Sequence, residues 1–458
     1  MILQAIANLV QSGGCTPDRF PGATNPPVEY PAIETIPALI DAGTDAANAQ
    51  NDGTPQDGAS TDAPLVPGVD IDTWVAPATL ALPKTASKVA SIDCGQGTSG
   101  FWIADIHADT NGVVWGLCSS KTGEAGSFWR YQPGSSDTIT TTPLPLRPTQ
   151  IFTNPANAHQ AFVAGQDMLM NRWGFSSVDD SGSVSPLLMP SLDAQGQPIS
   201  YFSALAVTNQ TVYGATSNLR DTPTWHFDPG SVSAWDVQKG GYAVFATSGL
   251  NPTGLGTYWG DAGHYVMVVN SGDTLPGDAL TAANGSIDLI NVDTGVISKW
   301  SDVAVGTGRH PITFTTSGAF YLGTYNGRVV RGEIAANDKG ELIKKGQLDA
   351  MTLPNTNATD DAYATATVIT LNGAEYLVAT NFNTGNEYVY DISDVNNGAF
   401  GQLARTYSFA SESSNGDAYG IAGVAGIPAR DSGTPSTHGG ILTAVGQDLY
   451  FAELTNAE

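Results

Sequence analysis

The chain has 458 residues and a formal net charge of −26, with 44 Asp and Glu against 18 Lys and Arg. A field of this sign repels nucleic acids and anionic membrane surfaces, which argues against both as direct partners, and it attracts cations or basic proteins. Only 14% of the residues are charged, against about a quarter in typical globular proteins. The 52 Gly and 27 Pro favour turns and short strands over long helices.

Residues 1–72 are expected to form an irregular N-terminal extension. From residue 16 the segment is rich in Pro, Ala, Asp and Gly, and Arg19 is its only basic residue. Such a composition buries too little apolar surface to offset the entropy lost on ordering. The segment is therefore predicted to be an acidic tether, unless the body of the protein or another subunit orders it.

Cys15 follows the small residues of "QSGGC". Bacterial lipoproteins carry small residues before the cysteine that is lipidated, and then a flexible tether. The similarity is loose, because Ser12 stands where the usual Leu would be. Two interpretations are open: Cys15 is a lipidation site, or "MILQAIANLV" forms a short helix that docks onto a partner or the body.

Cys94 and Cys118 flank the first predicted pair of strands, "FWIADI" and "VVWGLC". Strands that run back on themselves bring such cysteines within disulfide range, which would fit an oxidising compartment. Two unpaired buried thiols are the alternative. No CxxC or zinc-like Cys/His spacing occurs in the sequence.

A pair of short apolar runs recurs seven times along the chain. The paired runs are 113–118 with 127–132, 161–166 with 172–178, 211–216 with 232–237, 265–270 with 286–291, 320–325 with 328–333, 376–381 with 387–392, and 441–446 with 449–454. The first run usually follows a turn such as Asn111-Gly112 or Asn372-Gly373, which is preceded by another apolar run. The second run is usually followed by a turn and a fourth run.

Four strands in each roughly 50 residues, repeated in order, are typical of β-propeller blades. The sequence therefore predicts an all-β, seven-bladed β-propeller over residues 73–458, with six or eight blades as alternatives. Residues 73–83 are the predicted strand that completes the last blade, because the seventh repeat ends soon after "LYFAEL".

"YLVATNFNTGNEYVYDIS" (376–393) resembles the YVTN-type repeat of surface-layer and related seven-bladed propellers. Val378, Ala379, Thr380, Asn381 and Asp391 stand at matching positions. The resemblance is clear in the sixth repeat, fair in the third and weak elsewhere. It implies the propeller fold, but the superfamily includes binding proteins, lactonases and cofactor-bearing enzymes. No enzyme motif of that family matches here.

Candidate site residues precede the innermost strands, whose starting ends meet at one face of a propeller. "TDDAYATATV" and "NGDAYGIAGV" place Asp361 and Tyr363 in positions equivalent to Asp417 and Tyr419. Arg309-His310 precedes the fifth innermost strand. Converging carboxylates with an imidazole would bind a metal such as Ca²⁺, or act as general acid and base. In the alternative interpretation, Asp caps the turn and Tyr packs between blades.

A loop predicted over residues 217–230 carries Trp225, His226 and Phe227. Clustered aromatic side chains on such a loop would suit a protein or sugar contact. They would equally suit folding back over a blade edge.

Three functions follow from these features. The first is a secreted or cell-surface (extracytoplasmic) propeller that binds a protein partner or assembly without catalysis. The second is a lactonase-like or metal-dependent hydrolase with Asp361, Asp417, Arg309 and His310 at the channel mouth. The third is a periplasmic protein that carries a cofactor or metal. The first is favoured, because the sequence has no GxSxG motif, no Walker loop and no GxGxxG that opens a helix.

Overall fold

The computed structural model describes most of the repeat region and not the N-terminal extension. The described residues are 80–95, 101–120, 124–135, 139–167, 172–188, 201–208, 211–220, 226–260, 263–272, 285–300, 312–324, 327–354, 364–381, 384–394, 398–409, 420–429 and 439–456. Two compact units divide the chain, Met1–Arg19 with Leu82–Thr455, and Phe20–Ala81 with Asn456–Glu458. The fold described below is that of Leu82–Thr455.

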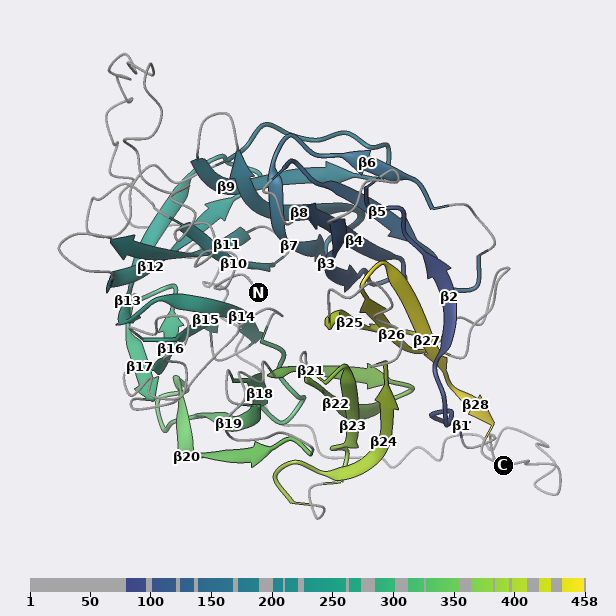
Figure 1. Ribbon diagram of the computed structural model, residues 1–458. Coiled ribbons are helices and arrows are strands. Elements are labelled where there is room, and N and C mark those ends of the chain that lie inside the picture. The colour runs from purple at the N-terminus through teal and green to yellow at the C-terminus, as the bar shows by residue number, and fades with distance from the viewer. Residues whose placement is uncertain are drawn as a thin grey trace, which may run out of the picture. The chain divides into compact units, whose positions relative to one another are not determined.

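Seven antiparallel sheets follow one another along this unit, and Figure 1 shows them arranged in a ring with the first strand of each sheet innermost. The first three sheets contain β3 (Phe101–Ala108), β4 (Val114–Ser120), β5 (Ser127–Tyr131) and β6 (Thr141–Pro143); β7 (Arg147–Asn154), β8 (Asn157–Asp167) and β9 (Arg172–Asp179); and β10 (Tyr201–Val207), β11 (Thr211–Arg220), β12 (His226–Asp236) and β13 (Tyr242–Leu250). The predicted seven-bladed propeller is confirmed.

The remaining blades continue the same order around the ring. They contain β14 (Pro252–Gly260), β15 (Gly263–Asn270), β16 (Ser286–Asn291) and β17 (Ile297–Trp300); β18 (Ala319–Gly323), β19 (Arg328–Ala336) and β20 (Leu342–Thr352); β21 (Ala364–Leu371), β22 (Ala374–Asn381), β23 (Asn386–Asp391) and β24 (Gln402–Ser408); and β25 (Ile421–Ile427), β26 (Gly440–Val445), β27 (Asp448–Glu453) and β2 (Ser87–Ser91). Two further strands, β1 (Leu80–Ala81) and β28 (Thr455–Asn456), form a separate short sheet. All seven predicted pairs of runs coincide with neighbouring strands of a blade.

Blades 2 and 5 are the two three-stranded sheets, and isolated bridges supply their missing edge. In blade 2, Phe175 bridges to Leu188 and Val178 to Val184, so residues 184–188 take the outer position. In blade 5, Phe314 bridges to Phe320, so the segment before β18 takes the inner position. The fourfold repeat of each blade is therefore preserved even where hydrogen bonding is partial.

The ring closes with an N-terminal strand, as predicted, but not with the predicted residues. The outermost strand of blade 7 is β2, whose Ser87 and Lys88 pair with Phe451 and Tyr450 of β27. The prediction placed this strand at residues 73–83, where the apolar residues are denser. The error arose because β2 is an outer, mostly exposed strand, and such a strand needs few apolar side chains.

Turn residues explain where the strands reverse. Asn372 and Gly373 both have positive φ, 50° and 82°, and they connect the last paired residues of β21 and β22, Leu371 and Ala374. Two successive positive φ values are the geometry of a two-residue hairpin turn that matches the strand twist, which is why Asn-Gly is favoured there. The Asn-Gly signal in the sequence thus sets the register of blade 6.

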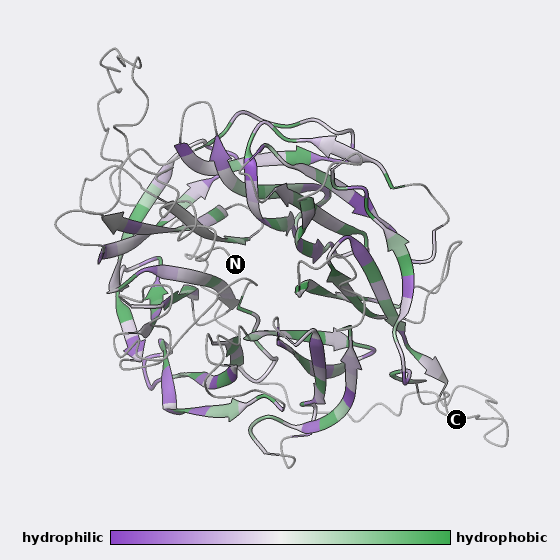
Figure 2. Ribbon diagram, viewed as in Figure 1, coloured by the Kyte–Doolittle hydropathy of each residue, from purple (hydrophilic) through white to green (hydrophobic). Residues whose placement is uncertain are grey.

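The hydrophobic core lies between neighbouring blades rather than within one. One cluster joins Trp115 and Leu117 of blade 1 to Ile151 and Val163 of blade 2. Comparable clusters join blades 2 and 3, 3 and 4, 4 and 5, 5 and 6, and 7 and 1. Outer strands such as β20 are mostly exposed and carry hydrophilic segments in Figure 2. Burial against the neighbours on both sides makes each blade depend on closure of the ring.

Candidate functional site

Trp225 of the predicted 217–230 loop lies outside the described residues, and so do all the residues predicted to converge at one face of the ring. These are Asp361, Tyr363, Asp417, Tyr419, Arg309 and His310. Their positions in the sequence relative to β21 and β25 agree with the prediction, because these strands begin at Ala364 and Ile421. Their convergence, and the proposed Ca²⁺ site at Asp361 and Asp417, remain predictions. Cys15 also lies outside the described residues.

The segment predicted as a loop over 217–230 is largely a continuation of the β11–β12 hairpin. After a register shift between Thr216 and Asn218, pairing continues to Arg220, which lies opposite His226. Phe227 is buried, whereas the side chains of His226 and Asp228 are 34% and 44% exposed and lie 3.5 Å apart. The alternation of a strand explains this difference, since successive side chains point to opposite faces.

The disulfide predicted between Cys94 and Cys118 is present. Cys94 follows β2, the closing strand of blade 7, and Cys118 lies in β4 of blade 1. The bond therefore links the two blades at which the ring closes. A disulfide of this kind is typical of oxidising compartments.

No group of three or more His, Cys, Asp or Glu side chains is arranged to hold a metal within the described ranges. The "HADTNG" segment (107–112) contains a strand turn. Asp109 accepts hydrogen bonds from the backbone N–H groups of Asn111 and Val113, at 2.8 and 2.9 Å. The carboxylate is thus occupied by the turn that it stabilises.

The described part of the chain also has no helix that could cross a membrane.

Polar side chains on the innermost strands connect consecutive blades. The Ile151 N–H donates to Asp105 Oδ2 at 3.0 Å, and the Leu205 N–H donates to Gln150 Oε1 at 2.7 Å. At the corresponding place in blade 6, the Val368 N–H donates to Thr313 Oγ1 at 2.7 Å. These contacts satisfy amides near the centre of the ring, where an unpaired N–H would be costly. Asp105 and Gln150 are therefore structural residues.

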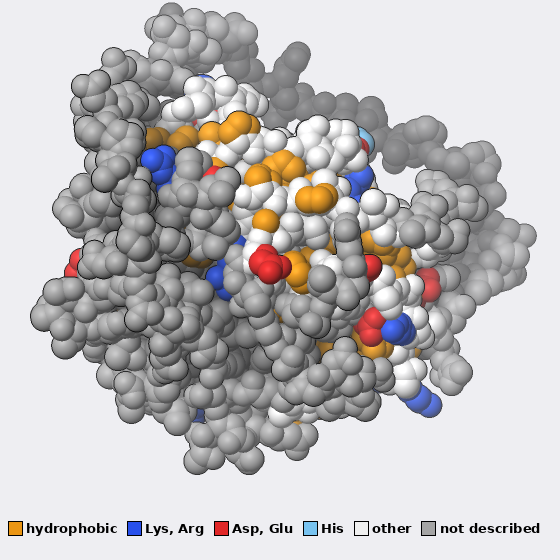
Figure 3. Space-filling model, turned by 45° about the horizontal axis from the view of Figure 1, so that its top comes forward, with side chains coloured by type: hydrophobic (Ala, Val, Ile, Leu, Met, Phe, Trp, Pro, Cys, Tyr) orange, Lys and Arg blue, Asp and Glu red, His pale blue; other side chains and the backbone are white. Residues whose placement is uncertain are grey.

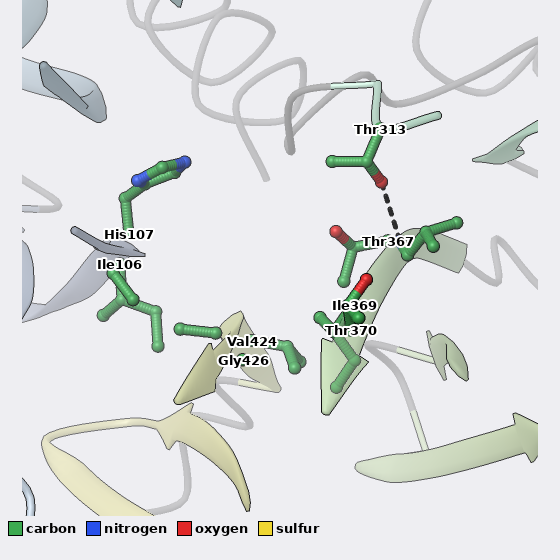
Figure 4. Close-up of a pocket in the computed structure, with 11 residues that line it drawn as sticks. Ile106, His107, Thr313, Thr367, Ile369, Thr370, Val424 and Gly426 are labelled. Atoms are coloured by element: carbon green, nitrogen blue, oxygen red, sulfur yellow. Dashed lines mark hydrogen bonds between the residues drawn. The ribbon is translucent and has the colours of Figure 1, made fainter. Parts of the chain in front are cut away.

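A pocket of about 210 Å³ lies at the innermost strands. Its lining residues are Ile106–Ala108 of β3, Thr313, Thr367–Thr370 of β21 and Val424–Gly426 of β25. Because these residues occupy the second halves of the three strands, the pocket is set back from the strand beginnings that the predicted site residues precede. Figure 4 shows His107 and Thr367 on opposite sides of this space.

His107 is the one imidazole in the pocket lining. Its Nδ1 lies 2.8 Å from Thr153 Oγ1, and its ring stacks on Phe152 with centroids 4.2 Å apart. Burial lowers the pKa of His107 to about 4, against a weaker opposing effect of the Ala108 carbonyl. The imidazole is thus neutral at physiological pH. Sequence reasoning did not single out His107; its place two residues after Asp105 on an innermost strand was the available signal.

Comparisons with known proteins support the fold. No protein-family model matches the chain, and no curated protein matches it. Kuenenia stuttgartiensis hydrazine synthase is similar with 13% identity and a TM-score of 0.51, over 79% of this chain and 97% of that one. The β-propeller domain of Myceliophteria thermophila Cps50 (Swd1) has 10% identity and a TM-score of 0.47, over 80% and 99%. At such identities the first likeness concerns the fold alone, and the second is too distant to add to it.

Proposed function

We propose that this protein is an extracytoplasmic β-propeller that acts as a binding or assembly module for a protein partner. The observation that carries the proposal is the extended β11–β12 hairpin of blade 3. Buried Phe227 anchors the extension, while His226 and Asp228 on either side of it are partly exposed. A hairpin held in place before binding loses little entropy when a partner docks, which favours affinity.

The remaining surface fits a selective contact better than broad hydrophobic association. On the face in Figure 3, the hydrophobic side chains of the described residues form small separate groups among polar ones. The net charge of −26 favours a partner with a basic surface. We therefore expect the hairpin to supply a local contact and the acidic field to increase the rate of encounter.

The cellular context belongs to the same proposal. The Cys94–Cys118 disulfide supports an oxidising compartment. Residues 1–72 would serve as a tether, with Cys15 as its lipid anchor. Mass spectrometry of the N-terminal peptide tests the anchor: an unmodified Cys15 in protein from the native cell would refute this part alone.

The main test removes the hairpin extension and keeps the blade. In this variant Leu219–Phe227 is replaced by Asn-Gly, which joins Asn218 to Asp228 through a tight turn. Wild type and variant are cross-linked in the native cell, and the recovered partner is quantified. A matched control, Asp180→Ala, removes an exposed carboxylate that lies 2.6 Å from His159 in blade 2.

We expect the hairpin variant to lose at least nine-tenths of the cross-linked partner and the Asp180→Ala control to keep it. Circular dichroism and thermal unfolding check that the variant retains its sheets. Undiminished cross-linking of the partner to a folded hairpin variant would overturn the proposed role of blade 3.

A further inference from the structure

The pocket at the innermost strands combines apolar walls with a polar edge. Ile106, Ile369 and Val424 contribute apolar side chains from three different strands. His107 and Thr367 contribute the polar groups, and Figure 4 shows them facing the same space. Thr370, also in the lining, is exposed, which places it where the pocket meets solvent.

The hydrogen bonds that the fold makes do not use all the polar atoms of His107 and Thr367. Both contacts of His107 with Thr153 use Nδ1, and Nε2 takes part in neither. The Thr367 hydroxyl has no hydrogen bond among the described residues, in contrast to Thr313, whose hydroxyl accepts from Val368. Both are thus able to bond a molecule in the pocket.

The lining carries no net charge at neutral pH. Among the described residues it contains no Asp, Glu, Lys or Arg, and the low pKa of His107, about 4, keeps the imidazole uncharged. A charged ligand would lose its hydration here without gaining a counter-charge, which disfavours its binding. The ligand class is therefore neutral.

The volume sets the size of the ligand. A pocket of 210 Å³ exceeds the roughly 150 Å³ of an engineered apolar cavity that binds benzene. Water alone is a poor occupant of the apolar side, because it finds no partners at Ile106, Ile369 and Val424. A ring with one polar substituent matches both the walls and the polar edge.

We propose that this pocket binds a neutral, ring-sized molecule with a hydrogen-bonding substituent, of the chemical class of a phenol. The substituent lies between His107 Nε2 and the Thr367 hydroxyl, which bond it from opposite sides, and Ile106, Ile369 and Val424 contact the ring. The site is separate from the hairpin of blade 3, so the ligand-binding proposal can be tested independently of the protein-binding role.

The test is calorimetric titration of the purified full chain at pH 7 with phenol as the probe. We expect saturable binding of one molecule with a dissociation constant of roughly 1 mM or tighter, given the affinity per atom of small ligands. Benzoate and benzylammonium, which have the same ring and opposite charges, should bind at least tenfold more weakly.

Three variants test the assigned contacts. His107→Leu and Thr367→Val each remove one polar group with little change in volume, and each should weaken phenol binding by about tenfold, the value of one hydrogen bond. Thr370→Phe places a ring at the mouth and should abolish binding. The matched control is His159→Leu, an exposed imidazole of blade 2 that lies outside the pocket lining, and it should bind phenol as wild type does.

Three results would overturn the proposal: no phenol binding by wild type, phenol binding by His107→Leu and Thr367→Val that is as tight as wild type, or benzoate binding as tightly as phenol. Thr367→Val guards against a folding artefact, because the two side chains have nearly the same shape.

Discussion

Blade 7 is joined to its two neighbours by different chemistry. At the junction with blade 1, Ile427 and Phe451 share an apolar cluster with Ile103 and Trp129, and the Cys94–Cys118 disulfide crosses the same junction. At the junction with blade 6, the Thr443 hydroxyl donates to the buried carboxyl of Glu387 at 2.7 Å. The first junction contains a covalent bond, whereas the second contains a titratable group.

The difference follows from what each junction must do. The junction with blade 1 closes the ring, and β2 is a short, mostly exposed strand with little apolar area to hold it. A covalent bond compensates for this weakness. The junction with blade 6 lies within the continuous chain, so it tolerates a buried carboxyl. A propeller can therefore place titratable groups between blades where closure does not depend on them.

The largest expected effect comes from breaking the covalent link. Replacing both Cys94 and Cys118 by Ser removes a bond between residues 24 positions apart, and we expect the free energy of unfolding to fall by about 3 kcal/mol. Chemical denaturation measures the change. Hydrogen exchange should show earlier opening of β2 than of β22 and β23.

Cys15→Ser is the matched control and should leave both measurements unchanged. Equal acceleration of exchange in blades 6 and 7 would contradict the assignment of the disulfide to ring closure.

The second effect is a pH dependence of stability caused by Glu387. Burial raises the pKa of Glu387 to about 7 from 4.5, and the Thr443 hydrogen bond opposes the change only in part. The folded state thus holds a proton that the unfolded state releases. The stabilisation is complete below about pH 4.5 and is lost as the pH rises through about 7.

Glu387→Gln keeps the shape and removes the titration. We expect the variant to match wild type near pH 4.5 and to exceed it by roughly 2–3 kcal/mol at pH 8, since one pKa unit corresponds to about 1.4 kcal/mol. Urea unfolding at a series of pH values measures the difference. A constant difference between the two proteins from pH 4.5 to 8 would show that Glu387 does not titrate in this range.

The contrast between the junctions also shows what the sequence could predict. Alternating apolar runs, the Asn372-Gly373 turn and the recurring spacing depend on local structure, and they correctly predicted seven blades and the paired strands. The disulfide was predictable because Cys94 and Cys118 flank one pair of strands. The exposed closing strand β2 was not predictable, because its five residues carry almost no apolar pattern.

The candidate site depended on contacts between distant residues. Phe227 lay in a predicted loop, yet strand pairing continues through it and buries it. The sequence could place His107 on an innermost strand but not in a pocket, because its surroundings come from Phe152 of the next blade and from β21 and β25. Glu387 reads as an ordinary polar strand residue, because its partner Thr443 is 56 positions away. Interblade contacts of this kind leave no local signal.

The smallest expected effect on stability comes from removing the Thr443 hydroxyl, which contacts the Glu387 carboxyl. Thr443→Val removes the hydrogen bond to Glu387 Oε2 and should lower stability by about 1 kcal/mol at pH 5. Because that bond favours the ionised carboxyl, its loss should raise the pKa of Glu387 further, so the fall in stability continues to a higher pH. Thr380→Val is the matched control: it breaks a buried 2.6 Å contact between the Thr380 and Thr365 hydroxyls and should leave the pH midpoint in place. If both variants shift the midpoint equally, general polarity between blades 6 and 7, rather than the Thr443 hydrogen bond, controls Glu387.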